Sequence, residues 1–373
     1  MGNTFITSKK IAREAMPILE ANKVMAALVH TDYKNEFQEK YNTVTVTKPA
    51  KFTAVEFDGD LTGEYQDVTQ GSVDVSLDYI ASVDMKITSK QRTLDIAQFN
   101  EEITAPAIEA ITQQIDAKIL GLYTDVPYFY GTSGTTPDEL KDISQVRKIL
   151  QENLVPIKDR RLVIDSEAEA EFGILDQFVS KDYIDSGVAL QDAILGKKLN
   201  FSIYADQNVK THTAGTFTAV TTPLTNGTIA ADATTLTLDG GSGTETLLVG
   251  DLIQIGTEQF VVTANATASG GAVSVSVYPA VAAEISDGTA VVFPDKTAKA
   301  HTANLAFHKN AFAFVSRPLM PASGEDSYTT SYNGIPIRVT MGYDFDTKSD
   351  IVSFDCLYGV KTLYPELAAV LLG

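Results

Sequence analysis

The chain has 373 residues, of which 44% are hydrophobic and 21% charged, enough for about two or three cores of ordinary domain size. Its formal net charge of −19 repels phosphate groups over most of the surface, which argues against a protein that grips nucleic acid. A container that encloses DNA without binding it stays compatible with this charge. No apolar run reaches the roughly 18 residues of a membrane span, and the first ten residues lack the pattern of a secretory signal. Ile6 stands where N-myristoylation requires Ser or Thr.

The pattern of apolar residues predicts a broken helix near the start and then strands. Residues 5–30 read as helical, with an interruption at Pro17. This region is either an arm that reaches over a neighbouring molecule or a simple capping helix. Between residues 43 and 90 the period changes from 3.6 to 2, which predicts a long hairpin with one apolar face. Its polar tip contains Gly59 and Gly63, and its apolar face requires a partner, either this chain or a neighbour.

Two helices and a buried strand are predicted next. Isoleucines at 108, 111, 115 and 119 form an apolar stripe, with Pro106 in the first turn and Gly121 at the end. A second helix is predicted from a capping box at Thr136–Glu139 through Leu154, before Pro156. Residues 162–164 predict a buried strand, and Ser166 with Glu169 predicts another capping box.

The composition then changes sharply. From Thr211 to Pro294 there is no lysine or arginine, and short alternating runs with polar turns predict a small all-β barrel or sandwich. Asp239-Gly240-Gly241 is typical of a hairpin turn. Because mixed α/β sequence resumes at Asn304, this segment is predicted to be an inserted domain. Strands are expected at 305–315, 335–339 and 351–357, followed by an apolar tail at 371–373.

Residues for catalysis or metal binding are scarce. The chain has four histidines, and no two have a metal-ligand spacing. Cys356 is its single cysteine, so no intrachain disulfide forms, and the surrounding sequence predicts a buried, inert thiol. Asp344, Asp346 and Asp350 resemble half a calcium loop, but Lys348 and Ser349 occupy key positions, so a solvated turn between strands is favoured. We expect no enzyme activity, cofactor or metal.

The order of these parts resembles the HK97-type major capsid protein of tailed phages. The similarity is carried by Ile194–Tyr204, by Asn304–Phe314 followed by Arg317-Pro318-Leu319, by Gly334–Val339, and by Asp355–Lys361 with Pro365-Glu366. It spans nearly the whole chain outside residues 211–300. An insertion at this place is similar to the coat proteins of short-tailed phages that carry an extra β-domain.

The resemblance implies an α+β fold with six parts. These are an N-terminal arm (1–40), an E-loop β-hairpin (41–91), a peripheral (P) domain with a long spine helix (92–159), the first part of an axial (A) domain (160–210), an inserted all-β domain (211–300), and closing strands of the A- and P-domains (301–373).

The resemblance also implies self-assembly as hexamers and pentamers into an icosahedral shell around double-stranded DNA, without sequence-specific binding or a membrane. The subunit would assemble in the bacterial cytoplasm and end in the virion, with a portal and a separate scaffolding protein, since no helical pro-segment precedes the arm. Candidate intersubunit contacts are Arg13, Lys48, Lys51, Phe57, Asp58 and Asp60.

Two alternatives remain open. An encapsulin-type compartment shell shares the fold, although the inserted domain is unusual for it. A glycan-binding adhesin acting through residues 211–300 is the alternative from another class. That segment contains no tryptophan and has Tyr278 as its only tyrosine, so it offers few stacking platforms for sugars.

Overall fold

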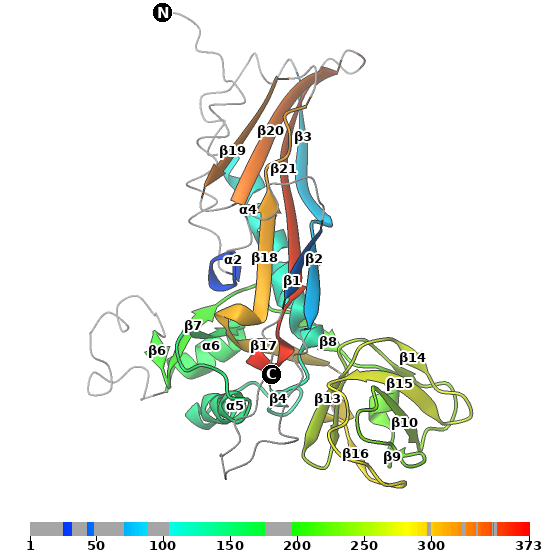
Figure 1. Cartoon of the computed structure of the whole chain (residues 1–373). Coiled ribbons are helices and arrows are strands. Elements are labelled where there is room, and N and C mark those ends of the chain that lie inside the picture. The colour runs from blue at the N-terminus through cyan, green and yellow to red at the C-terminus, as the bar shows by residue number, and fades with distance from the viewer. Residues whose placement is uncertain are drawn as a thin grey trace, which may run out of the picture. The chain divides into compact units, whose positions relative to one another are not determined.

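The computed structural model describes residues 25–31, 43–47, 71–88, 104–175, 196–296, 300–322, 326–332, 335–344, 346 and 349–373. The chain divides into two compact units (Figure 1). Of the described residues, the first unit holds 31, 43–47, 71–88, 104–111 and 313–363, and the second holds 25–30, 112–312 and 364–373. Among these residues no helix has the length and apolar character needed to cross a membrane.

The first unit holds mainly strands, together with the first residues of helix α4 (Ala105–Leu120). A short ribbon pairs β1 (Thr43–Thr47) with β2 (Ser72–Ser76) in antiparallel register, from Thr43 opposite Ser76 to Thr47 opposite Ser72. A larger sheet has the order β18-β21-β20-β19, and β3 also pairs with β21. Its strands are β3 (Tyr79–Thr88), β18 (Phe312–Arg317), β19 (Asp326–Tyr332), β20 (Ile335–Asp344) and β21 (Ser349–Thr362).

The strand expected to continue the hairpin has a different partner. Residues 79–88 form β3 as predicted, but β3 pairs along its whole length with β21, from Tyr79 opposite Tyr358 to Thr88 opposite Ser349. The period-2 pattern gives the strand and its apolar face, but it contains no information about the partner. At one end of this pairing, the aromatic rings of Tyr79, Tyr358 and Phe314 follow one another at centroid distances of 5.7 and 6.2 Å.

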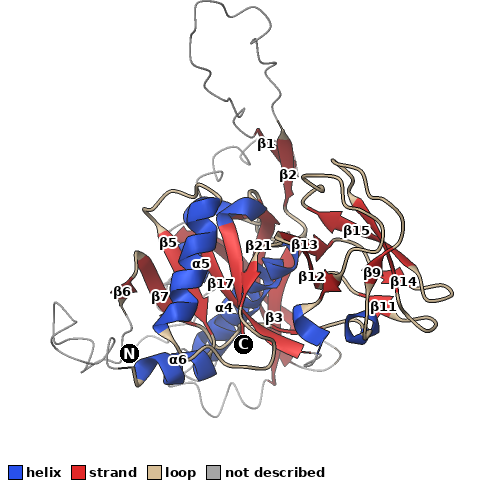
Figure 2. Ribbon diagram, turned by 90° about the horizontal axis from the view of Figure 1, so that it is seen from below, coloured by secondary structure: helices blue, strands red, loops and turns tan. Residues whose placement is uncertain are grey.

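The second unit is built on a mixed sheet covered by helices. Its strand order is β4-β22-β17-β5-β7-β6, with β8 paired to β17. These strands are β4 (Phe129–Tyr130), β5 (Arg160–Ile164), β6 (Lys197–Lys198), β7 (Phe201–Ala205), β8 (Thr211–Thr213), β17 (Ala300–His308) and β22 (Ala368–Leu372). Figure 2 shows α5 (Leu140–Glu152) lying across this sheet, and Ile143, Val146 and Leu150 pack there on Leu162 and Phe201.

Four described helices accompany the sheets. They are α2 (Met25–Leu28), α4 (Ala105–Leu120), α5 and α6 (Ser166–Gly173), with a 3-10 turn (Gly121–Asp125) after α4. The predicted isoleucine stripe of α4 is confirmed, because Ile108, Ile111, Ile115 and Ile119 are all buried. Ala26 N donates to Asp116 Oδ1 at 3.2 Å and ties α2 to α4.

Both predicted capping boxes were wrong in position. Helix α5 begins at Leu140, where the Glu139 side chain accepts from the backbone at Asp142 and the Asp142 side chain accepts from Glu139 N. Helix α6 is capped by Asp165, whose carboxylate accepts from Ala168 N at 3.3 Å. In each case a nearby carboxylate satisfies the first amide groups better than the predicted hydroxyl does. Leu154 lies beyond the end of α5 and is exposed.

Residues 211–296, which we call the β-rich segment, form their own core in the second unit. A six-stranded sheet has the order β16-β12-β13-β15-β10-β9, and β11 pairs with β14. The strands are β9 (Leu224–Thr225), β10 (Thr235–Asp239), β11 (Thr246–Leu247), β12 (Leu252–Ile255), β13 (Glu258–Val262), β14 (Ala266–Thr267), β15 (Val273–Tyr278) and β16 (Val291–Val292). Two 3-10 turns, Thr216–Ala219 and Pro294–Lys296, flank them. The predicted alternation in β10 and β15 is confirmed by burial of Leu236, Leu238 and the three valines of β15.

Two predictions about connections were wrong. The turn at Asp239-Gly240-Gly241 does not close a hairpin, since β10 pairs with β15 and β9 rather than with the next strand. The strand expected at 305–315 is two strands, β17 and β18, separated by the 3-10 turn Lys309–Ala311. The apolar tail is itself a buried strand, because β22 lies between β17 and β4 in the sheet.

Candidate functional site

The predicted intersubunit contacts lie outside the described residues. Arg13, Lys48, Lys51, Phe57, Asp58 and Asp60 therefore stay predictions. The structure does describe the base of the ribbon that leads to five of them. There Val46 and Val75 are buried, whereas Thr45 and Asp74 are exposed and share a hydrogen bond of 2.6 Å.

The base of the ribbon packs on its own unit. A Cβ added to Gly359 of β21 would lie 1.9 Å from the carbonyl oxygen of Ser76 in β2. Only glycine allows these two backbones to approach so closely. Val46 and Val75 at the base are thus buried within this chain.

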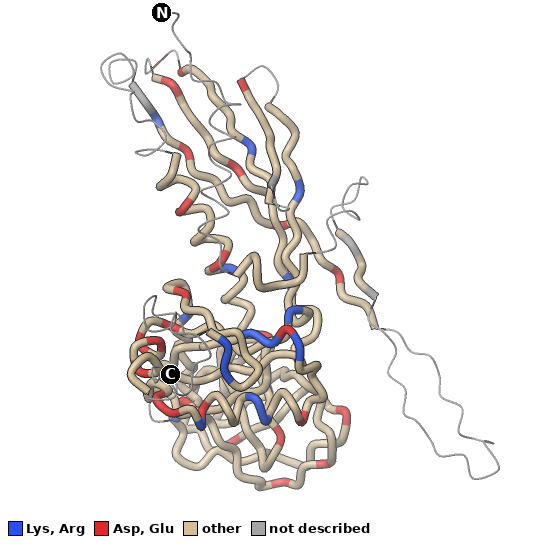
Figure 3. Tube along the Cα trace, turned by 90° about the vertical axis from the view of Figure 1, so that its left-hand side faces the viewer, with Lys and Arg blue, Asp and Glu red and all other residues tan. Residues whose placement is uncertain are grey.

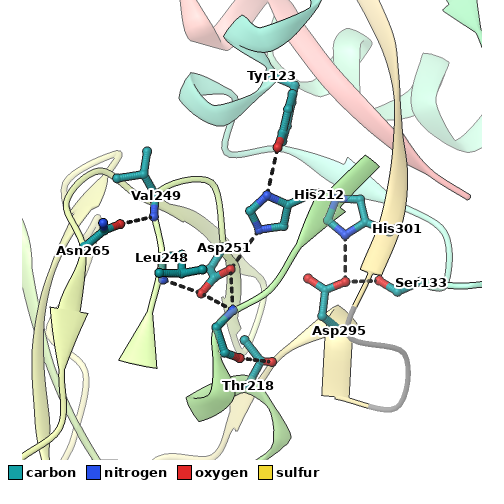
Figure 4. A network of polar contacts seen from close by, with 11 residues as sticks. Tyr123, Ser133, His212, Thr218, Leu248, Val249, Asp251, Asn265, Asp295 and His301 are labelled. Carbon is teal, nitrogen blue, oxygen red and sulfur yellow. Dashed lines mark hydrogen bonds and ion pairs between the residues drawn. The ribbon is translucent and has the colours of Figure 1, made fainter. Parts of the chain in front are cut away.

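A buried polar network anchors the β-rich segment to the rest of the second unit (Figure 4). Strands β8 and β17 lead into and out of the segment and pair with His212 opposite His301. The two imidazole rings lie 5.2 Å apart between centroids. His212 contacts Asp251 and His301 contacts Asp295, so the network has two halves.

In the first half, His212 contacts Tyr123, which lies outside the β-rich segment, and Asp251, which lies inside it. Its Nε2 lies 2.8 Å from Asp251 Oδ1, and its Nδ1 lies 2.9 Å from the hydroxyl of Tyr123. Burial, and then the charges of Asp251 and Asp295, raise the pKa of Tyr123 to about 12, so the phenol keeps its proton. The Tyr123 hydroxyl and the Asp251 carboxylate therefore hold the two ring nitrogens of His212. Asp251 also accepts from the backbone amides of Gly215 and Leu248.

In the second half, Asp295 is the centre. Its Oδ1 accepts from His301 Nδ1 at 2.7 Å and from Ser133 Oγ at 2.5 Å. All three residues are buried. Neither Asp295 Oδ2 nor His301 Nε2 has a hydrogen-bond partner, which is unusual for buried polar atoms.

The network differs from a Ser-His-Asp catalytic triad, because the Ser133 hydroxyl bonds to the carboxylate of Asp295 and not to an imidazole. Cys356 is fully buried, and burial followed by the charge of Asp355 raises the pKa of its thiol to about 12. Within the described part of the chain, no group of three His, Cys, Asp or Glu residues is arranged to hold a metal ion.

The suspected calcium half-loop is a turn. Strand β20 ends at Asp344 and β21 begins at Ser349, as the predicted turn between strands requires. Asp346 N donates to Asp344 Oδ1 at 2.9 Å, and Lys86 forms an ion pair with Asp344 at 3.7 Å. These contacts use the carboxylate of Asp344 for local structure.

Sequence reasoning missed the histidine–aspartate network. The histidines have no metal-ligand spacing along the chain. They come close only because β8 and β17 pair in antiparallel register. One signal was present: His212 lies at the start of the stretch without lysine or arginine, and His301 lies shortly after its end.

A contact between Gln259 of the β-rich segment and Phe129 covers the edge of the sheet that contains β4. Gln259 of β13 accepts from Phe129 N at 3.2 Å and donates to Phe129 O at 3.0 Å. These are the two hydrogen bonds that another strand would make to β4, which lies at the edge of its sheet. The β-rich segment therefore covers an edge that would otherwise be open to association.

Comparison with known proteins identifies the fold. Residues 250–373 match the family model described as "P22 coat protein - gene protein 5", which covers the last third of the chain. A search of curated proteins found no match.

Two solved structures are similar over almost the whole chain. One is from Mycobacterium phage Che8, with a TM-score of 0.55 and 17% identity, covering 94% of this chain and 90% of that one. Another is the mature capsid of bacteriophage PhiM1, with a TM-score of 0.50 and 10% identity, covering 94% and 86%. The chain has the α+β capsid fold of the HK97 type, and its carboxy-terminal third carries the sequence pattern of the P22 coat protein.

Proposed function

We propose that the chain is the major capsid protein of a tailed bacteriophage. It assembles with copies of itself, as hexamers and pentamers, into an icosahedral shell that encloses double-stranded DNA. The observation that carries this proposal is the capsid fold over 94% of the chain, combined with the coat-protein match of residues 250–373.

The described residues support a structural rather than a catalytic role. The thiol of Cys356 is buried and protonated, and the buried imidazoles hold carboxylates in a network that joins two parts of one chain. Among the described residues, the Cys356 thiol thus serves packing, and the two histidine–aspartate pairs serve anchoring. A shell subunit needs only shape and interface energy, since one surface must serve both five-fold and six-fold rings.

The E-loop is the proposed main contact with a neighbour. Its base is fixed by the close approach of β2 to Gly359. The chain between β1 and β2, which carries Lys48, Lys51, Phe57, Asp58 and Asp60, extends from that base and lies on the adjacent subunit. The N-terminal arm with Arg13 makes a second contact, and a hinge motion of both would accompany maturation.

The shell requires other partners. A separate scaffolding protein and a portal complete its assembly in the bacterial cytoplasm, and the finished subunit resides in the virion. The net charge of −19 supports enclosure of DNA without sequence-specific binding.

Expression of the chain, with scaffolding protein supplied if required, tests the proposal by negative-stain electron microscopy. Closed shells or long tubular polyheads are expected. A stable monomer would contradict it, and a monomer that binds glycans would instead support the adhesin. Shells that form in uninfected cells around a specific protein cargo, and that exclude DNA, would indicate an encapsulin-type compartment.

A further inference from the structure

The turn between α5 and β5, residues 153–159, has an unusual conformation. Val155 N donates to Leu150 O and Leu154 N donates to Gln151 O, both at 3.0 Å, which is the hydrogen-bond pattern of a Schellman motif. The motif places Leu154 at φ 56°, in the left-handed region where glycine is the usual residue. The Leu154 side chain is 89% exposed, so contacts within the chain offset little of this strain.

A buried arginine makes the α5–β5 turn rigid. Arg160, which is 1% exposed, donates from Nη2 to Val155 O at 2.6 Å and from Nε to Pro156 O at 2.9 Å. The turn therefore holds Ile157, 57% exposed, beside Leu154 as a second large aliphatic side chain on the surface. Strain combined with rigid exposure of apolar groups is typical of a binding surface.

The same corner is rich in basic residues, which are Arg147, Lys158, Arg160, Arg161 and Lys309. Asp159 of the same turn offsets part of this charge, since it acts to raise the pKa of Arg161. Among the described residues, no carboxylate forms an ion pair with these five. Arg160 and Arg147 are close enough that, after burial, the charge of Arg147 further lowers the pKa of Arg160. Arg147 Nε and Arg160 Nη1 are buried without a hydrogen-bond partner. Figure 3 shows basic positions close together in the unit that ends at the C-terminus.

A second copy of the chain offers the complementary surface. Residues 211–294 contain no lysine or arginine, and the acidic residues there are Asp232, Asp239, Glu245, Asp251, Glu258, Glu284 and Asp287. Of these, Asp232, Glu284 and Asp287 are exposed. Copies with a net charge of −19 repel one another, and this repulsion is reduced where a basic surface meets an acidic one.

We propose that the α5–β5 turn is an intersubunit contact, in which Leu154, Ile157 and Lys158 dock on the acidic β-rich segment of a neighbouring copy. The inference rests on the proposed shell function. The two exposed aliphatic side chains favour a protein partner over DNA, since a phosphate backbone offers them no apolar surface.

Carbodiimide cross-linking of assembled particles tests the contact. Particles are assembled from a mixture of ¹⁴N- and ¹⁵N-labelled chains. The carbodiimide then joins neighbouring amines and carboxylates, and the products are digested with trypsin. Because trypsin has no site between Lys210 and Lys296, the acidic segment is released as one peptide. We expect mixed-isotope products that join Lys158 to that peptide. The proposal would be overturned if every product that joins Lys158 to that peptide carried a single isotope. It would also be overturned if Lys158 were protected from cross-linking in DNA-filled particles alone.

Two variants separate docking from folding. Leu154→Gly relieves the strain, so the thermal midpoint of the unassembled chain should be unchanged or higher, while the yield of particles falls several-fold. Lys158→Glu should lower the yield similarly, whereas Lys158→Arg preserves it. Normal assembly of both Leu154→Gly and Lys158→Glu would refute this contact and leave the shell function intact. Failure of the unaltered chain to assemble would refute the shell function itself.

Discussion

At the scale of single residues, Asp251 accepts hydrogen bonds from more residues than Asp295, the other carboxylate of the histidine–aspartate network. Its carboxylate is fully buried and accepts hydrogen bonds from His212 and from the amides of Gly215 and Leu248. We expect Asp251→Ala to lower the free energy of unfolding by about 3–5 kcal/mol, because it leaves several buried donors without an acceptor. Urea denaturation measures this loss. Glu284→Ala removes an exposed carboxylate of the same segment and should change stability by less than about 0.5 kcal/mol.

His308 makes stability depend on pH. Burial lowers its pKa, and Arg160 and Arg161 lower it further, although Asp159 acts in the opposite direction. The folded chain therefore keeps His308 neutral, while the unfolded chain binds a proton near pH ~6.5. Stability is greatest above that pH and falls as the pH drops below it. His308→Asn retains an acceptor for Asn310 N and should flatten the decline in unfolding free energy below pH ~6.5. An unchanged slope would exclude His308 as its source.

At the scale of elements, Gly359 decides whether β2 and β21 can pack. A methyl group at this position would meet Ser76 O at 1.9 Å, and a backbone atom cannot move aside cheaply. We therefore expect Gly359→Ala to destabilise the chain by more than about 3 kcal/mol or to make it insoluble. Gly173→Ala is the matched control, since its added Cβ meets nothing within 4 Å and it lies at the end of helix α6. That variant should be neutral or slightly more stable. Equal loss in both would show that close backbone approach is not the cause.

Gln259 is predicted to protect the edge strand β4. Gln259→Ala leaves Phe129 N and O without their partners, so we expect a loss of about 1–3 kcal/mol and faster aggregation by light scattering. Gln254 is opposite Gln259 in the β12–β13 pair, and its side-chain amide donates to the carbonyl of nearby Gly256. Gln254→Ala should therefore match the unaltered chain, and aggregation at equal rates in the two variants would argue against edge protection.

At the scale of the whole molecule, the two units are interleaved along the chain. The boundary between them falls inside α4, after Ile111, and between Phe312 and Ala313 at the start of β18. Because each unit is assembled from separate stretches of the chain, we expect the unfolding of one unit to be coupled to that of the other. Differential scanning calorimetry should show a single transition, with equal calorimetric and van't Hoff enthalpies. Two resolved transitions would mean that the units fold independently.

The sequence by itself determined the local structure of this protein. The isoleucine stripe of α4, the alternation in β10 and β15 and the buried thiol of Cys356 follow from periodicity and residue type, which the chain carries locally. Ordered similarities along the chain also predicted the capsid fold. The boundaries of its six parts and the contacts at Arg13 and the E-loop stay predictions.

Tertiary structure decided every feature that depends on partners distant in sequence. The pairing of β3 with β21, the place of the tail β22 inside a sheet and the meeting of His212 with His301 are questions of register. A period-2 pattern says which face of a strand is buried, but it is the same for every possible neighbour. Only the packing of the complete chain selects one neighbour, because burial and buried hydrogen bonds are satisfied together in that arrangement alone.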